Sequence, residues 1–321
     1  MISHRLTPLT ESGILAALSV VLGLMAVFLP VLGVVAVFLW ALPLLVLVVR
    51  QGVRFGVAAA VAASAVLSLF AGPLLALRMC VAFAPVGLVL GWGIGRGWSG
   101  VRTFLAGLAA SVASKLLAFL LLFFLMGIDP WQAQLDGLTQ AFSTTLSMYE
   151  DMGLDAAAVA QSRGEIEAAL TMIARLAPLV VLIMGLSDTV VLFLLGGRIL
   201  RRLGSAAPQL PPFGAWRLPV GFLYLFGFSL VGLYWGGTRE LPAVYTAALN
   251  ANMAAMLAGG IQGLSLLSVL LGHFRLGRGV RILIYVFVLF NGLLLQIVAF
   301  TGLIDMFFDY RKRFAGRTGG R

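Results

Sequence analysis

Charged residues are scarce in this sequence, and so are the side chains on which most catalytic and metal sites depend. Only 11% of the 321 residues are charged, against roughly 25% in an ordinary soluble domain. The one cysteine, Cys80, excludes an internal disulfide, and the two histidines, His4 and His273, have no partner at metal-ligand spacing. The H-E-x-x-H, G-x-S-x-G and Walker A motifs are also missing. We therefore expect no catalytic residue, no metal and no cofactor.

Apolar residues dominate instead, because 61% of the chain is hydrophobic and the mean hydropathy is +1.06. A bilayer core about 30 Å thick needs roughly 20 apolar residues per crossing helix. The chain contains nine apolar runs that approach this length, at residues 13–29, 33–49, 55–70, 74–94, 103–126, 176–200, 218–235, 248–271 and 282–304. The sequence therefore predicts an all-α fold, a polytopic bundle of on the order of eight to ten transmembrane helices.

The formal net charge of +10 reflects membrane orientation rather than nucleic-acid binding. Arginines gather in alternate connections between the apolar runs, and basic loops face the cytoplasm. No basic stripe with interleaved aromatic residues is present, so we expect no nucleic-acid partner. The pattern predicts a bacterial inner-membrane protein with a cytoplasmic N-terminus and a cytoplasmic, basic C-terminus.

Nine full crossings conflict with that orientation, since they would place the basic tail outside. Our preferred solution is a helical hairpin over residues 282–308 that turns at Asn291 and Gly292, because this dipeptide favours turns. Each arm would be too short to cross, so we expect the hairpin to be buried within the protein. The alternative is that the segment boundaries between Leu241 and Leu271 are misplaced.

Two polar segments divide the chain into domains. Residues 129–175 carry a net charge of −5, and apolar residues at helical spacing between Asp155 and Ala174 predict an external amphipathic helix. Four prolines in residues 206–219 exclude a continuous helix there. We predict a six-span bundle over residues 1–205 with the insertion at 129–175. A cytoplasmic linker over 206–219 and a membrane unit of two or three segments over 220–321 would follow.

Two ionisable residues fall in the middle of apolar runs, where a charge is costly and commonly functional. Lys115 and Asp188 lie on consecutive spans at similar depth. They could neutralise each other between two helices, line a solute site or proton path, or fail to meet. Arg78, near the outer end of its span, either extends to the interface or contributes to an anion-binding pocket.

Other polar and small residues could bind a solute or a partner. Asn250, Asn252, Gln262 and Asn291 either join helices by hydrogen bonds or form a polar path. Small residues recur on the first span at Ala16, Ser19, Gly23 and Ala26. We expect this stripe to serve internal packing, with a docking face for a transmembrane coupling protein or other membrane subunit as the alternative.

Two stretches resemble the YybS-like family of bacterial membrane proteins of unknown function. One is Pro211-Pro212-Phe213 with Trp216 and Pro219. The other is the closing Gly302-Leu303-Ile304-Asp305 through Asp309-Tyr310-Arg311-Lys312-Arg313. The similarity extends over nearly the whole chain.

The first six spans also resemble the S components of energy-coupling-factor transporters. The similarity lies in Leu15-Ala16-Ala17-Leu18, the span containing Pro43 and the Gly72-Pro73 turn. It implies a six-helix bundle that binds a vitamin or metal near its outer face and docks a transmembrane coupling protein served by two ATPases. We therefore expect binding or uptake of a small solute, and the alternative is a scaffold or accessory subunit that acts through protein partners.

Overall fold

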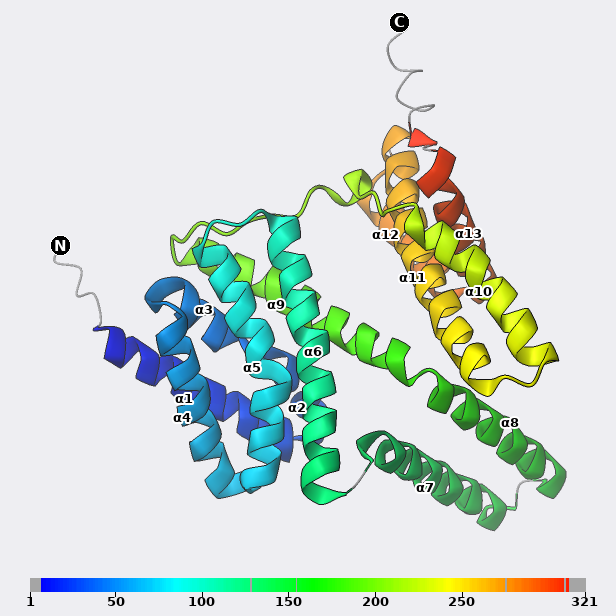
Figure 1. The fold of residues 1–321 in the computed structure, drawn as a ribbon, viewed down its shortest axis with the longest axis horizontal. Helices are drawn as coiled ribbons and strands as arrows, with labels where there is room; N and C mark the ends of the chain where they lie inside the picture. The colour runs from blue at the N-terminus through cyan, green and yellow to red at the C-terminus, as the bar shows by residue number, and fades with distance from the viewer. Residues whose placement is uncertain (1–6, 128, 154, 275, 309, 312–321) are drawn as a thin grey trace, which may run out of the picture. The chain divides into compact units, whose positions relative to one another are not determined.

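The computed structural model describes residues 7–127, 129–153, 155–274, 276–308 and 310–311, and within these ranges it contains helices and no strand. Seven of the described helices are long and apolar enough to cross a membrane, which confirms a polytopic helical bundle. The chain folds as two compact units (Figure 1). Unit 1 comprises residues 1–170 and 180–209, and unit 2 comprises residues 171–179 and 210–321.

Unit 1 is built from helices joined by very short connections. Its helices are α1 (Pro8–Phe28), α2 (Pro30–Leu39), α3 (Leu42–Gln51), α4 (Val53–Ala71), α5 (Pro73–Gly95), α6 (Gly100–Met126) and α7 (Pro130–Asp151), while α8 (Ala156–Arg175) and α9 (Ala177–Arg202) include residues of both units. Gly52 and Gly72 separate consecutive helices at φ values of +95° and +82°. These backbone angles favour glycine, so each turn needs only one residue.

The core of unit 1 forms around α3, whose Leu44, Leu45 and Leu47 are fully buried. Helix α5 approaches α3 closely because Gly91 has no side chain, and a Cβ there would lie 2.8 Å from the Leu45 carbonyl oxygen. Large apolar side chains also cover the outside, as Phe124 on α6 is 78% exposed. An apolar exterior is expected where lipid, rather than water, surrounds the helices.

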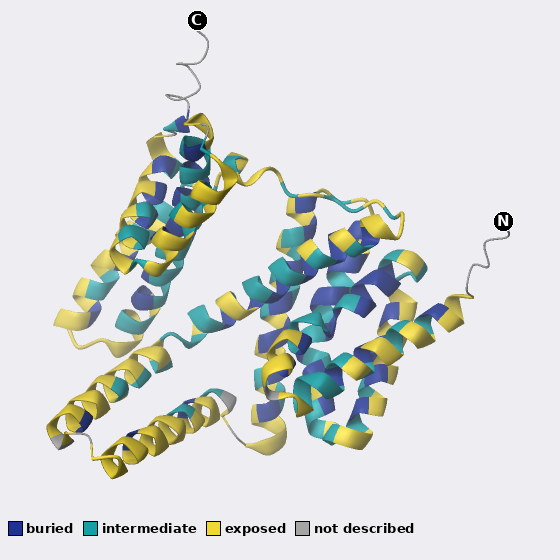
Figure 2. Cartoon of the chain, turned by 180° about the vertical axis from the view of Figure 1, so that it is seen from behind, coloured by how far each residue is buried: buried dark blue, intermediate teal, exposed yellow. Residues whose placement is uncertain are grey.

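The insertion at 129–175 contains two amphipathic helices, whereas the sequence predicted one. Helix α7 precedes the predicted α8, and both are exposed along most of their length (Figure 2). Asp129 caps the start of α7 by accepting from the backbone N–H of Trp131 at 2.9 Å. Leu146 and Val159 are buried where the two helices face each other across a cavity of about 540 Å³.

Unit 2 begins with the proline-rich linker and packs around one long helix. The linker contains a short 3-10 turn, Phe213–Ala215, and leads to α10 (Gly221–Thr238), α11 (Pro242–His273), α12 (Arg278–Phe290) and α13 (Gly292–Phe308). Helix α13 lies against α11 through glycine: a Cβ at Gly259 would be 2.6 Å from the Ala299 carbonyl oxygen. Close approach through small residues is the usual way in which membrane helices pack.

Helices α12 and α13 form a bent pair, with an angle of 100° at Asn291. Helix α12 follows the end of α11 after a short connection, and the end of α13 bonds to Gln262 on α11 and, through Arg311, to linker residue Gly214. The pair therefore begins and ends at the same end of unit 2. This connectivity favours a re-entrant element over a broken crossing.

The turn at Asn291 lies where the sequence predicted it, but the expected burial of the whole hairpin is wrong, because α13 packs against α11 while α12 is largely exposed. Within α12 Val288 is buried, while Phe290 beside the turn is 88% exposed. The break costs few backbone hydrogen bonds, because the Asn291 side chain accepts from the N–H of Leu294 at 3.0 Å. An apolar helical arm whose backbone is paired internally can face lipid.

The sequence predicted on the order of eight to ten crossing helices. Seven described segments qualify by length and composition, with α2 and α3 together forming one of them, or eight if the bent pair also counts as one. Helix α10, which covers the predicted segment 218–235, is not among them. The alternative of misplaced boundaries between Leu241 and Leu271 is excluded, because α11 runs without a break from Pro242 to His273.

Candidate functional site

Lys115 on α6 and Asp188 on α9 meet in the interior of unit 1. The Lys115 ammonium group donates to Asp188 Oδ2, and each side chain is only 3% exposed. Ser111, one turn before Lys115, joins them: its hydroxyl accepts from Lys115 Nζ at 3.0 Å and donates to Asp188 Oδ2 at 3.3 Å. The lysine nitrogen also lies 5.0 Å from the centre of the Phe83 ring, a favourable position for a cation.

Tight packing surrounds this pair. Gly185 allows α9 to approach α6, since a Cβ there would come within 2.7 Å of the Val112 side chain. Among the interpretations of the sequence, the pair that neutralises itself between two helices agrees best with this environment. Neither side chain lines the cavities described for this unit, so those cavities give no support for a solute chamber at this position.

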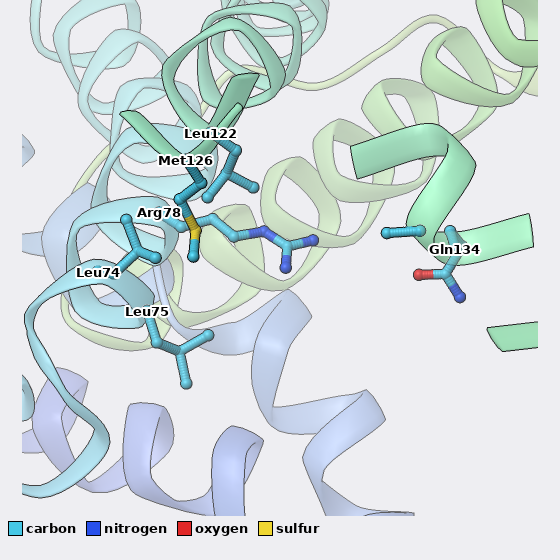
Figure 3. A pocket seen from close by; sticks show the side chains of 7 residues that line it. Leu74, Leu75, Arg78, Leu122, Met126 and Gln134 are labelled. Atoms are coloured by element: carbon cyan, nitrogen blue, oxygen red, sulfur yellow. The ribbon is translucent and has the colours of Figure 1, made fainter. Parts of the chain in front are cut away.

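Arg78 occupies an open cavity at the other candidate position in unit 1. The cavity has a volume of about 300 Å³ and is lined by Leu74, Leu75 and Arg78 from α5, Leu122 and Met126 from α6, and Ala133 and Gln134 from α7. Figure 3 shows the Arg78 side chain extending past Leu122 and Met126, with Gln134 on the opposite side of the cavity.

The guanidinium of Arg78 is the charged group of this cavity. No carboxylate of the described residues forms an ion pair with it. The remaining lining is apolar except for the Gln134 amide. A single cation with planar donors above apolar walls suits a ligand that carries a carboxylate or phosphate on an apolar body.

Unit 2 contains a second buried polar cluster, of which only Gln262 was singled out from the sequence. Asp305 on α13 accepts from Gln262 Nε2 at 2.7 Å and from Arg311 Nε at 3.3 Å, and both charged side chains are at least 93% buried. Gln262 in turn accepts from the backbone N–H of Leu218 in the linker at 3.0 Å. Every strong donor and acceptor of this cluster thus has a partner within the protein.

Arg311 connects the cluster to the 3-10 turn of the linker. Its guanidinium donates to the Gly214 carbonyl oxygen at 2.5 Å and to the Ser265 hydroxyl at 3.1 Å, while Ser265 donates to the Phe213 carbonyl oxygen at 2.5 Å. The two stretches that resemble YybS-like proteins are therefore joined in space. The sequence could have indicated this ion pair, because Asp305 and Arg311 have opposite charges and lie close together along the chain.

The other amides are used in hydrogen bonds between neighbouring segments. Asn250 accepts from the Leu179 N–H at 3.1 Å and donates to the Arg175 carbonyl oxygen at 2.7 Å, while Asn252 donates to the Ser229 hydroxyl on α10 at 3.0 Å. These contacts hold helices together. They give no support for a continuous polar path.

The small-residue stripe of α1 faces inward at two of its four positions. Ser19 and Gly23 are buried, and a Cβ on Gly23 would touch Leu67 and Trp40 at 3.1 Å, whereas Ala16 and Ala26 are half-buried. Internal packing accounts for Ser19 and Gly23. At the start of the same helix, buried Glu11 pairs with Arg50 at 2.5 Å, an ion pair that the sequence analysis did not identify.

The chain contains no evident metal centre in the part that the structure describes, since no three histidine, cysteine or acidic side chains converge there. The model of a family described as "Predicted membrane protein (DUF2232)" matches residues 17–306. The chain belongs to this family, in agreement with the YybS-like resemblance. No curated protein and no solved structure matched the sequence.

Proposed function

We propose that this member of the DUF2232 family of predicted membrane proteins binds a small anionic solute in the Arg78 cavity, as the substrate-binding subunit of an uptake system would. The single observation that carries the proposal is an unpaired guanidinium in a cavity of about 300 Å³ with mostly apolar walls. This volume is at the lower limit for ligand pockets, so the solute is small.

The position of the cavity supports uptake from outside. Arg78 lies near the start of α5, whereas Arg96 and Arg102 lie at the opposite end, where α5 gives way to α6. Because basic connections face the cytoplasm, the Arg78 cavity belongs on the outer side of a bacterial inner membrane, with both termini inside. The S-component resemblance of the first six spans, which implies ligand binding near the outer face, points the same way.

The Lys115–Asp188 pair has a positioning role in this proposal. It fixes α6 to α9 from within the bundle, and α6 supplies Leu122 and Met126 to the cavity wall. A buried, hydrogen-bonded ion pair can specify one arrangement of helices even where it adds little net stability. The pair would thus maintain the cavity without contacting the solute.

The test is a ligand-dependent thermal shift on the detergent-purified full chain, because a ligand that binds the folded state raises the unfolding temperature. The panel contains small carboxylates, phosphate esters, carboxylate-bearing vitamins, nucleobases and metal ions. We expect a shift from an anionic compound, lost in Arg78→Gln and kept in Arg54→Gln, which alters an exposed arginine at the opposite end of the unit. A panel without any shift, or a shift that survives Arg78→Gln, would overturn the proposal.

A second candidate function is that of an accessory subunit that docks a membrane partner on α1. Gly13 and Ala17, one turn apart, are exposed, and Ile14 and Leu18 beside them are 54% and 46% exposed. An exposed small pair on an apolar face suits close helix contact. Here a stoichiometric partner would co-purify with the chain, survive Arg78→Gln and be lost in Gly13→Leu.

A further inference from the structure

Unit 1 has a groove at the end opposite the Arg78 cavity, with a volume of about 220 Å³. It lies where the turn between α3 and α4 faces the end of α5, and it is lined by Val48, Gly52, Val53, Gly95, Trp92 and Arg96, among others. Arg96 directly follows α5 and is exposed. The groove therefore has a cationic side and an apolar side.

Glycine leaves the groove open. At Gly91 a Cβ would lie 2.7 Å from the Val48 Cβ, so α5 and α3 are in direct contact there. One turn later, a Cβ on Gly95 would meet only the Cα of Val49, at 4.0 Å. The helices thus separate between Gly91 and Gly95, and the space over Gly95 can accept part of another molecule.

Aromatic rings hold the cations of this region in place. The Arg96 guanidinium carbon lies 5.5 Å from the centre of the Trp92 ring, and the Arg102 guanidinium carbon lies 4.1 Å from the centre of the Trp98 ring. The two tryptophans pack edge to face with centroids 4.8 Å apart. Stacking on a ring restrains an arginine while leaving its outward N–H groups able to bind an anion.

No acidic side chain of the described part of the chain neutralises these arginines. Glu11, the acidic residue found at this end, is buried and is already bonded to Arg50 and Gln51, each at 2.5 Å. The carboxylates of α7 and α8 follow the other end of α6, and Asp188 is paired in the interior. The groove therefore presents uncompensated positive charge.

We propose that this groove binds an anionic phospholipid, whose headgroup phosphate accepts from Arg96 and whose acyl chain lies against Val49 and Val53. Trp92 is 39% exposed and marks the depth of the bilayer interface, where tryptophan is enriched. A basic pocket between helices on the cytoplasmic side is a known form of lipid-headgroup recognition. A soluble anion would use the cation but would leave the valine wall unoccupied. This site is independent of the Arg78 cavity.

The experiment counts lipids retained by the full chain in native mass spectrometry, after reconstitution with phosphatidylcholine and increasing phosphatidylglycerol. We expect preferential retention of phosphatidylglycerol, and a loss of apparent affinity of about tenfold in Arg96→Gln, since a charge-assisted contact is removed. Gly95→Val should block retention although every arginine remains. The matched control is Arg202→Gln, an exposed arginine at the end of α9, which should retain lipid normally.

The outcomes separate a local site from a general surface charge. An equal loss in Arg202→Gln and Arg96→Gln would overturn the proposal, because diffuse charge would then explain the preference. Unchanged retention in Gly95→Val would also overturn it. Inorganic phosphate provides the last arm: if it displaces phosphatidylglycerol at comparable concentration, the site recognises a free anion and not a lipid.

Discussion

Lys115 and Asp188 form an ion pair across α6 and α9 in which each side chain is 3% exposed. Removing one partner leaves an uncompensated buried charge, which commonly costs about 3–5 kcal/mol, whereas replacing both partners by apolar residues of similar size is often neutral. We therefore expect Lys115→Met and Asp188→Leu to lower the thermal unfolding midpoint strongly, and the double variant to recover most of the loss. Additive losses in the double variant would contradict the pairing.

The Asp305–Arg311 cluster predicts how firmly the linker is held. Asp305→Ala removes the acceptor shared by Gln262 and Arg311, so their bonds to Leu218 and Gly214 should weaken. We expect limited proteolysis within residues 206–219 to accelerate by about tenfold or more, since the linker opens more often. Thr301→Ala, an exposed position on the same helix, is the control. Equal cleavage rates in the two variants would disprove this role for Asp305.

Close packing of α11 and α13 predicts opposite effects at two buried glycines. A Cβ on Gly302 would collide with the backbone of Gly259 and Gly263, whereas a Cβ on Gly260 would meet no atom within 4 Å. Gly302→Ala should therefore destabilise the protein by about 1–3 kcal/mol or more, because backbone must move. Gly260→Ala should be neutral or slightly stabilising, since alanine favours helix. Thermal unfolding of both variants is the measurement, and similar midpoints would count against the glycine contact.

The re-entrant path of α12 and α13 predicts the sidedness of unit 2. In a Cys80→Ser background, a cysteine introduced at Gly277 should be labelled from the cytoplasmic side, and a reporter fused after the last residue should be active on that same side. The same topology requires α10 to cross the membrane as well, so a cysteine at Glu240, between α10 and α11, should be labelled from outside. Labelling of positions 240 and 277 from the same side would contradict the crossing of α11, and a reporter on the side opposite to position 277 would contradict the re-entrant path.

The helical architecture could be predicted from sequence because apolar length alone largely determines a membrane-spanning helix. The turn at Asn291 was also predictable, since Asn-Gly favours a turn and the asparagine side chain caps the helix that follows. The exposure of α12 was not predictable, because it depends on which helices pack against α12, and hydropathy does not identify packing neighbours.

The candidate site was predictable in part for a similar reason. A lone charge in an apolar run is conspicuous, so Lys115, Asp188 and Arg78 could be identified individually. Whether Lys115 faces a cavity or a packed seam depends on small residues such as Gly185, whose effect appears only when α9 lies against α6. Asp305 was not identified because it lies close to the charged end of the chain, where an acidic residue is common and does not indicate a buried site.

The bond from Arg311 to Gly214 joins positions 97 residues apart and closes unit 2 into a loop of chain. During synthesis the linker emerges long before Arg311, and Ser265 and Gln262 on α11 are the first of its partners to follow. Unit 2 can therefore complete its polar cluster only when translation is almost finished. A nascent chain stalled before Asp305 would hold the linker through α11 alone, without the ion pair that completes the cluster.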